Sequence, residues 1–457
     1  MNLAKDPIPL LVRRIAFPAS VGWFFNTMFN VVDTFWAGQL SAQAIAALSL
    51  SMIPFLGLLS LGIGLGQGTN ALVSNALGAQ QNERAVRLIA QALLLALVAS
   101  GLVMLLGQTF TPVLYRHMGA EESYLEMALS YIDWLIYGCA TFIINLTANA
   151  GLNAQGDTKT YRNALICGFL ANIILDPLLM FGWGPFPQMG VEGIAIATIL
   201  IQLGIVLYVI MKVRQSSLGQ QLRFKYFKPQ QGLLRDLIRQ GLPSTISMMF
   251  IALNFFVILF FISDYGKSAV AAFGVSTRIV QVMLLPTIGL NVAALSLTGF
   301  NFGAGDLHRV KEIWRTCMRI ALLMMCIGAV VLFAVPRLWL GLFTESPEIL
   351  DVGESLLRVE AVLLPAYTTL FLGVAVLQGL KKPMFGMILG GYRLIIAPVT
   401  LFWFLSEVLE NGLNGIWVGI FLTTFSGAVI TWFFVKYTFL KITTQSGKTL
   451  VQLIWGC

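Results

Sequence analysis

The sequence predicts an all-α polytopic membrane protein with about 12 transmembrane helices in two pseudo-symmetric six-helix lobes. Three observations support this fold class. Hydrophobic residues make up 57% of the 457 residues and charged residues only 11%, whereas soluble proteins are about a quarter charged. The apolar residues form long runs without charge, such as residues 34–82. The second half of the chain also repeats features of the first half.

Apolar runs between polar breaks predict twelve helices, because each run is long enough for a span of about 20 residues. The mean hydropathy of +0.81 agrees with a chain that lies mostly in the membrane. The helices are expected to begin near Ile15, Ala44, Leu88, Met127, Tyr161, Val191, Leu242, Ala271, Cys317, Leu357, Met384 and Leu413.

The charge of the loops predicts the orientation of the chain. Lys and Arg gather in the N-terminal segment and in every second loop, most densely between Lys212 and Arg239. The opposite loops are mainly acidic, as in the segment from Glu345 to Glu354. This is the positive-inside pattern, so we expect both termini in the cytoplasm. The net charge of +8 faces anionic lipid and does not indicate binding to nucleic acid.

An internal repeat predicts the division into lobes. Ser41–Ser51 aligns with Gly266–Ser276, and Pro18 aligns with Pro243 at the same offset. Six spans per repeat give parallel halves, and we expect them to form a V around a central cavity and to rock between two open states. The predicted domains are an N-terminal lobe at 1–212, a basic cytoplasmic linker at 213–239 and a C-terminal lobe at 240–457.

Polar side chains inside the predicted spans of the first lobe are the candidate site. Inserting a charged side chain at mid-membrane costs about 2.5–3.5 kcal/mol, so a charged residue at this position suggests a functional role. Within each helix the spacing of these residues puts them on one face. Shared polar faces favour a water-filled cavity over the alternative, in which each residue makes an isolated interhelical hydrogen bond worth about 0.6 kcal/mol. They are Asn26, Asn30 and Asp33 in the first helix, Asn145, Asn149 and Asn153 in the fourth, Asn172 and Asp176 in the fifth, and Thr198 in the sixth.

The residue types in this set suggest two coupling ions. Two aspartates in a low dielectric do not both ionise cheaply, so Asp33 and Asp176 suit proton exchange, with Asn172 and Thr198 as donors to the ionised carboxylate. The same four side chains supply hard oxygen ligands for Na⁺, and the sequence leaves H⁺ and Na⁺ open. The remaining asparagines are expected to line the substrate cavity, and Pro18 is expected to act as a hinge in the first helix.

These features resemble the multidrug and toxic compound extrusion (MATE) family. The resemblance rests on Pro18 and Asp33 in the first helix, the Asn172-x-x-x-Asp176-Pro177 motif in the fifth and GVEGIAIAT ending at Thr198 in the sixth. It is similar to the DinF branch, which implies that the first-lobe aspartates and their Asn and Thr neighbours couple transport to protons. The NorM branch places acids in the seventh and tenth helices, where this chain has Asn254 and Glu360.

The resemblance implies H⁺-coupled antiport of hydrophobic, often cationic, drugs and dyes across the cell inner membrane, by a monomer that contacts membrane lipids. Two alternatives stay open: a Na⁺-coupled exporter of the same family, and a lipid-linked oligosaccharide flippase that would use Arg278. An enzyme would need an HExxH, a Ser/Lys pair or a carboxylate–metal motif within the spans, and the sequence has none. We therefore expect no enzymatic activity and no metal or other cofactor beside the coupling ion.

Overall fold

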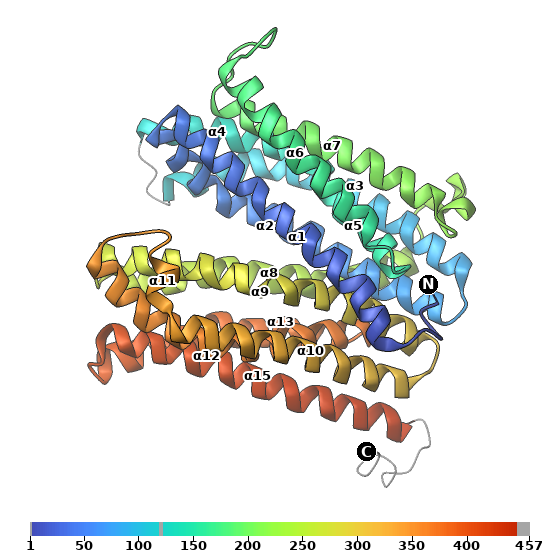
Figure 1. Ribbon diagram of the computed structural model, residues 1–457. Coiled ribbons are helices and arrows are strands. Elements are labelled where there is room, and N and C mark those ends of the chain that lie inside the picture. Colours follow the sequence, from blue (N-terminus) through green and yellow to red (C-terminus); the bar gives the residue numbers. More distant parts are fainter. Residues whose placement is uncertain (1, 118–121, 446–457) are drawn as a thin grey trace. The chain divides into compact units, whose positions relative to one another are not determined.

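The computed structural model describes residues 2–117 and 122–445, and every regular element in these ranges is a helix (Figure 1). The elements of the first half are α1 (Ile8–Leu40), α2 (Ala42–Gly78), α3 (Asn82–His117), α4 (Glu122–Tyr137), α5 (Cys139–Ala154), α6 (Lys159–Phe181), α7 (Val191–Gln215), η1 (Gly219–Gln221) and η2 (Phe224–Phe227). Those of the second half are α8 (Gln231–Ser263), α9 (Lys267–Gly303), α10 (Leu307–Ala334), α11 (Pro336–Leu340), α12 (Pro347–Gly379), α13 (Met384–Gly391), η3 (Tyr392–Ile396), α14 (Ala397–Trp403), η4 (Phe404–Val408) and α15 (Gly412–Gln445).

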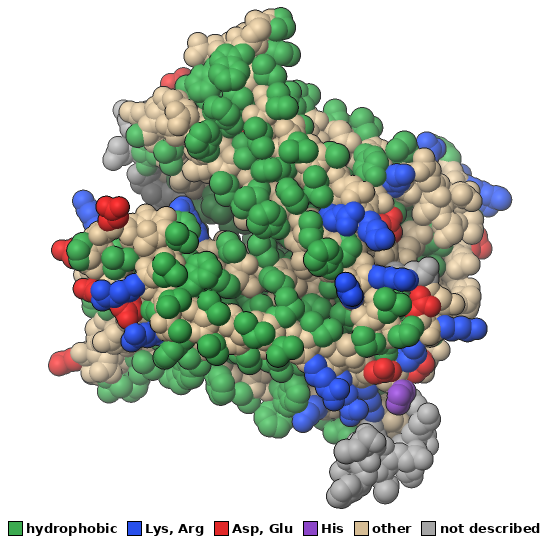
Figure 2. Space-filling model, viewed as in Figure 1, with side chains coloured by type: hydrophobic (Ala, Val, Ile, Leu, Met, Phe, Trp, Pro, Cys, Tyr) green, Lys and Arg blue, Asp and Glu red, His purple; other side chains and the backbone are tan. Residues whose placement is uncertain are grey.

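The number of membrane spans agrees with the prediction. Eleven of the described helices are long and apolar enough to cross a membrane, counting Met384–Val408 as one span. The bent pair α4 and α5, at an angle of 46°, forms a twelfth. Hydrophobic side chains cover the middle of the visible helices and charged side chains lie toward their ends (Figure 2). The protein is therefore a multi-pass, all-helical membrane protein, as the sequence predicts.

Several helices begin well before the predicted start. α8 begins at Gln231 instead of near Leu242, and α10 begins at Leu307 instead of near Cys317. The hydropathy pattern marks only the apolar part of a helix, whereas the helical backbone continues through polar residues outside the hydrocarbon. The true start of α10 is set by Asp306, whose carboxylate accepts a hydrogen bond of 2.9 Å from the backbone N–H of Arg309.

The chain forms two compact units whose limits lie inside α1 and α8. The N-unit comprises residues 18–252, and the C-unit comprises residues 1–17 and 253–457, of which 2–17 and 253–445 are described. The first residues belong to the C-unit because Arg309 Nη2 donates a hydrogen bond of 2.9 Å to the carbonyl of Asp6. The predicted lobes at 1–212 and 240–457, with a linker at 213–239, stay a prediction.

Glycines on two faces of α2 allow close helix packing in the N-unit. A Cβ atom at Gly68 would lie 2.8 Å from the backbone nitrogen of Gly241 in α8, and one at Gly64 would lie 2.5 Å from the backbone nitrogen of Thr245. On the other face, a Cβ atom at Gly62 would lie 2.8 Å from Leu146 of α5. α2 is therefore wedged between α5 and the first part of α8, as small residues allow in membrane helices.

Two apolar clusters make up most of the core of the N-unit. The first contains Phe29 of α1 and Leu165 of α6, and the second contains Ala37 of α1 and Met180 of α6. α5 and α7 contribute to both clusters as well. Between the two clusters, one or two helical turns of α1, α5, α6 and α7 form a layer near the middle of these helices. This layer contains the candidate site. We call it the polar layer; its residues are Asp33, Asn145, Asn172, Asp176 and Thr198.

Candidate functional site

One asparagine joins the two aspartates of the polar layer. Asn172 Nδ2 donates hydrogen bonds to Asp33 Oδ1 at 3.0 Å and to Asp176 Oδ1 at 2.9 Å. Asn172 and Asp176 lie one turn apart on α6, so their i, i+4 spacing puts both side chains toward Asp33 of α1. Asn172 and Asp176 are completely buried and Asp33 is 6% exposed. The structure thus brings together three of the four predicted coupling residues.

Several buried oxygen atoms of the polar layer have no hydrogen-bond partner among the described residues. Asn172 Oδ1, Asp176 Oδ2 and Thr198 Oγ1 make no hydrogen bond with any described residue. Thr198 lies on α7, which approaches α6 so closely that a Cβ atom at Gly193 would be 2.7 Å from the backbone nitrogen of Met180. A buried polar atom without a partner costs about 1–3 kcal/mol. A proton on one carboxylate, or a small cation bound by the oxygens of Asn172 and Asp176, would offset that cost and the repulsion between two buried charges.

The asparagines of α5 form a separate polar contact in the same layer. Asn145 Nδ2 donates a hydrogen bond of 3.0 Å to Gln202 Oε1 of α7. Asn145, Asn149 and Asn153 are all buried, and the Oδ1 atoms of Asn145 and Asn149 have no partner among the described residues. No hydrogen bond in the described part of the chain links this stripe to the aspartates, so its role in a substrate cavity stays a prediction.

The three polar residues of α1 do not share one buried face. Asp33 lies on the buried stripe of Phe29 and Ala37, at i−4 and i+4, and points toward α6. Asn26 is half-buried and Asn30 is exposed. The predicted stripe spans about 60° at 100° per residue, which is wide enough to straddle the edge of the buried face.

Two residues near the site were missed by the sequence analysis. Tyr131 of α4 is buried in the same apolar cluster as Ala37 and Met180, which lie one helical turn from Asp33 and Asp176. Gln202 of α7 receives the hydrogen bond from Asn145. A single tyrosine in an apolar helix carries no pattern that separates it from the core. Gln202 did carry a signal, since it follows Thr198 at i+4 on the same helix face.

The C-unit also contains a buried acid within a predicted span. Glu360 of α12 is only 8% exposed, and its Oε2 atom has no partner among the described residues. Two turns further along the same helix, the ring of Tyr367 lies 5.9 Å from the guanidinium of Arg393. α12 begins at Pro347, well before the predicted start near Leu357, so Glu360 lies inside the helix and not in its first turn.

The second half also holds the other polar residues that the sequence analysis considered. Asn254 Nδ2 donates a hydrogen bond of 2.7 Å to the carbonyl of Leu394, in the π-helical turn η3. A π-helical turn interrupts the regular α-helical hydrogen bonds, and the side chain of Asn254 supplies a donor to a carbonyl in this turn. Arg278 of α9 is exposed, and Arg393 is half-buried beside Tyr367.

Comparison with known proteins identifies the family. The MatE family model matches residues 18–178 and 243–403. The chain is 25% identical over 417 residues to the probable multidrug resistance protein YoeA of Bacillus subtilis, covering 90% of this chain and 88% of that protein. It is also 25% identical over 403 residues to an FAD transporter of Shewanella oneidensis, covering 88% of each.

A solved structure supports the fold independently of the sequence matches. A crystal structure of MATE in the bent conformation superposes with a TM-score of 0.91 at 24% identity, over 98% of both chains. The two segments that match the family model cover more than half of the chain and begin at the repeated prolines Pro18 and Pro243. With its helical membrane fold and its internal repeat, the protein belongs to the MatE family of membrane transporters.

Proposed function

We propose that the protein exports hydrophobic, cationic compounds in exchange for protons, and that Asp33, Asn172 and Asp176 are the coupling site. The observation that carries this proposal is the single amide of Asn172 bonded to both carboxylates. The multidrug name of a relative, YoeA, supports the substrate class. The bridged pair of acids in the first half, against the lone acid Glu360 and the neutral Asn254 in the second, favours a DinF-like scheme over the NorM-like one.

The bridged geometry suggests how proton and substrate would compete. With Asp33 ionised, charge-assisted hydrogen bonds hold it to α6 and its negative charge attracts a cation. Protonation weakens this hold and removes the charge, so the cation leaves while α1 can change shape. Each ligand then favours a different state, as exchange requires. A charge moved down the membrane potential contributes about 2.3 kcal/mol per 100 mV.

The proposed site of action is the cell inner membrane, with both termini in the cytoplasm and the protein acting as a monomer. Support for this orientation comes from the described basic residues of the α7–α8 connection and of the start of α10. Acidic side chains on the other side include Asp351 and Glu354, which pair with Arg337 at 2.6 and 2.5 Å.

Na⁺ coupling is the second candidate, since the free oxygens of Asn172, Asp176 and Thr198 suit a hard cation. Proteoliposomes with either a pH gradient or a Na⁺ gradient, imposed separately, distinguish the two ions. We expect cationic dye to exchange in response to the pH gradient alone. Exchange driven only by Na⁺ would assign these oxygens to the metal ion instead.

Removal of the bridging amide is expected to weaken coupling. Asn172→Ala leaves two buried carboxylates without their shared donor, and hydrogen bonds to charged groups contribute about 1.5–3 kcal/mol each. We expect at least a roughly tenfold slower pH-driven exchange, measured as dye movement in proteoliposomes at equal protein content. Asn254→Ala is the matched control, since it removes an amide from a span of the C-unit. Equal loss in both variants would contradict the proposal.

Pro18 provides a test of the shape change in α1. It lies inside a continuous helix, at the division between the units, about 22 Å from Asp33 at 1.5 Å per residue. Pro18→Ala restores a backbone donor and should keep substrate affinity while slowing exchange several-fold, as measured by dye binding and counterflow. Pro112→Ala in α3 controls for removal of an intrahelical proline. Exchange at the wild-type rate in Pro18→Ala would exclude the hinge.

A further inference from the structure

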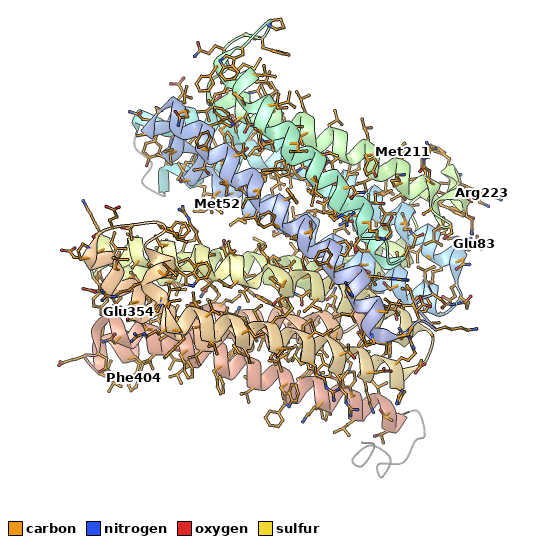
Figure 3. The ribbon with its side chains drawn as sticks, in the orientation of Figure 1. Met52, Glu83, Met211, Arg223, Glu354 and Phe404 are labelled. Carbon is orange, nitrogen blue, oxygen red and sulfur yellow. The ribbon has the colours of Figure 1, made fainter. Side chains whose placement is uncertain are left out.

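The connection between α7 and α8 presents an unusual exposed side chain. Phe224 is 92% exposed, more than any other large hydrophobic side chain among the described residues. Its neighbours Arg223 and Lys225 are exposed as well. Arg223 lies at the same end of the N-unit as Glu83 (Figure 3). Exposure of a large aromatic side chain to water is unfavourable, so a partner of suitable chemistry would be expected to cover it.

Contacts with α3 fix the conformation of this segment. Gln91 is completely buried, and its Nε2 donates hydrogen bonds of 2.6 Å to the carbonyl of Tyr226 and 2.8 Å to that of Lys228. Its Oε1 accepts a bond of 3.0 Å from the backbone N–H of Gln230. Tyr226 is buried, with the guanidinium of Arg87 5.4 Å from its ring. Phe224 is thus held outward by a well-anchored backbone.

The charge of the connection is entirely positive. No acidic residue occurs between Lys212 and Arg235, and the next one along the chain, Asp236, pairs with Arg84 at 3.2 Å. Beside the segment, an open surface depression is lined in part by the exposed Arg235 and Arg239. The basic residues of the connection are Lys212, Arg214, Arg223, Lys225, Lys228 and Arg235.

The connection follows directly on a lipid-facing helix surface. On α7 the exposed residues Leu200, Leu203, Leu207 and Met211 form one stripe at helical spacing. This helix is about 37 Å long at 1.5 Å per residue, against a hydrocarbon thickness of about 30 Å. Met211 and Arg223 lie at the same end of the N-unit (Figure 3). From this length we infer that the segment after Gln215 is near the level of the lipid headgroups.

We propose that residues 222–228 form a docking surface for anionic phospholipid, in which Phe224 enters the headgroup region while Arg223 and Lys225 contact lipid phosphates. Aromatic side chains favour this region, and basic side chains next to it are attracted to anionic lipid. A protein partner would have to replace lipid at a surface that continues the lipid-facing stripe of α7. The proposal does not depend on the coupling ion or the transported substrate.

Photocrosslinking tests the surface on the full-length protein. The photoreactive analogue p-benzoylphenylalanine is placed at position 224, and the protein is reconstituted in nanodiscs of mixed phosphatidylcholine and phosphatidylglycerol. After illumination, mass spectrometry identifies the adduct. We expect adducts enriched in phosphatidylglycerol over its share of the lipid. The same analogue at the exposed Gln220 is the positional control and should give fewer lipid adducts.

Charge and anchoring variants sharpen the test. Arg223→Gln with Lys225→Gln is expected to reduce the phosphatidylglycerol adduct roughly tenfold, because two cations near an anionic surface are lost. Both side chains are exposed, so melting temperature should not change. Gln91→Ala should lower the adduct by releasing the backbone, with all charges kept. The proposal is overturned by no lipid adduct at 224 above the control, by an adduct that ignores headgroup charge, or by crosslinking to protein instead.

Discussion

Asp33→Asn is expected to abolish pH-driven export while leaving the protein folded in the membrane. Asparagine has nearly the shape of aspartate, and its oxygen can still accept the hydrogen bond from Asn172. It cannot lose a proton, so neither proton exchange nor attraction of a cation remains. Loss of a charge-assisted hydrogen bond worth about 1.5–3 kcal/mol alone predicts a ten- to hundredfold effect. Dissipation of a pH gradient by added substrate in proteoliposomes measures it.

Glu360→Gln is the matched control, because it neutralises another buried acid within a span. We expect this variant to keep most of the pH-driven exchange, whereas Asp176→Asn and Thr198→Ala should impair it. Full activity of well-expressed Asp33→Asn would remove the coupling role of the first half. Greater loss in Glu360→Gln would move the coupling site to the C-unit and favour a NorM-like scheme.

Gly64→Leu is expected to prevent correct folding. Even a Cβ atom at this position would lie 2.5 Å from the backbone nitrogen of Thr245, and backbone cannot move aside as a flexible side chain can. Overpacking typically costs about 1–3 kcal/mol, and a whole leucine side chain between two helix backbones should exceed this range. Size-exclusion chromatography of the detergent-solubilised protein should show aggregated material and little monodisperse protein.

Gly57→Leu controls for the change in residue type on the same helix. No described atom lies within 4 Å of a Cβ atom at Gly57, and leucine has the higher helix propensity by about 0.5–1 kcal/mol. This variant should therefore remain monodisperse with an unchanged or raised melting temperature. If both variants gave the same size-exclusion profile and the same melting temperature, close packing of α2 against α8 would be contradicted.

Hydrophobic periodicity predicted those features that are properties of a single helix and do not depend on how helices pack together. The apolar runs predicted the number of spans, and the i, i+4 spacing of Asn172 and Asp176 predicted that both face one neighbour. The choice of that neighbour depends on tertiary packing, as does the exposure of Asn30 on the edge of the same face as Asp33. The burial of Glu360 likewise depends on which helices pack against α12, and hydropathy does not show this.

If the gene is divided within residues 213–230, the first part of α8 is separated from the N-unit, to which it belongs. The first part of α8 fills the glycine face of α2, and the connection before it is bonded to Gln91 of α3. In return, the first residues of the chain are bonded to Arg309 of α10. Each unit therefore contains a segment that lies on the other side of this division in the sequence. Either fragment expressed by itself would lack that segment, and the helix surface that it covers would be exposed. Co-expressed fragments should regain function only when they assemble together, which makes bisected chains a sensitive reporter of assembly.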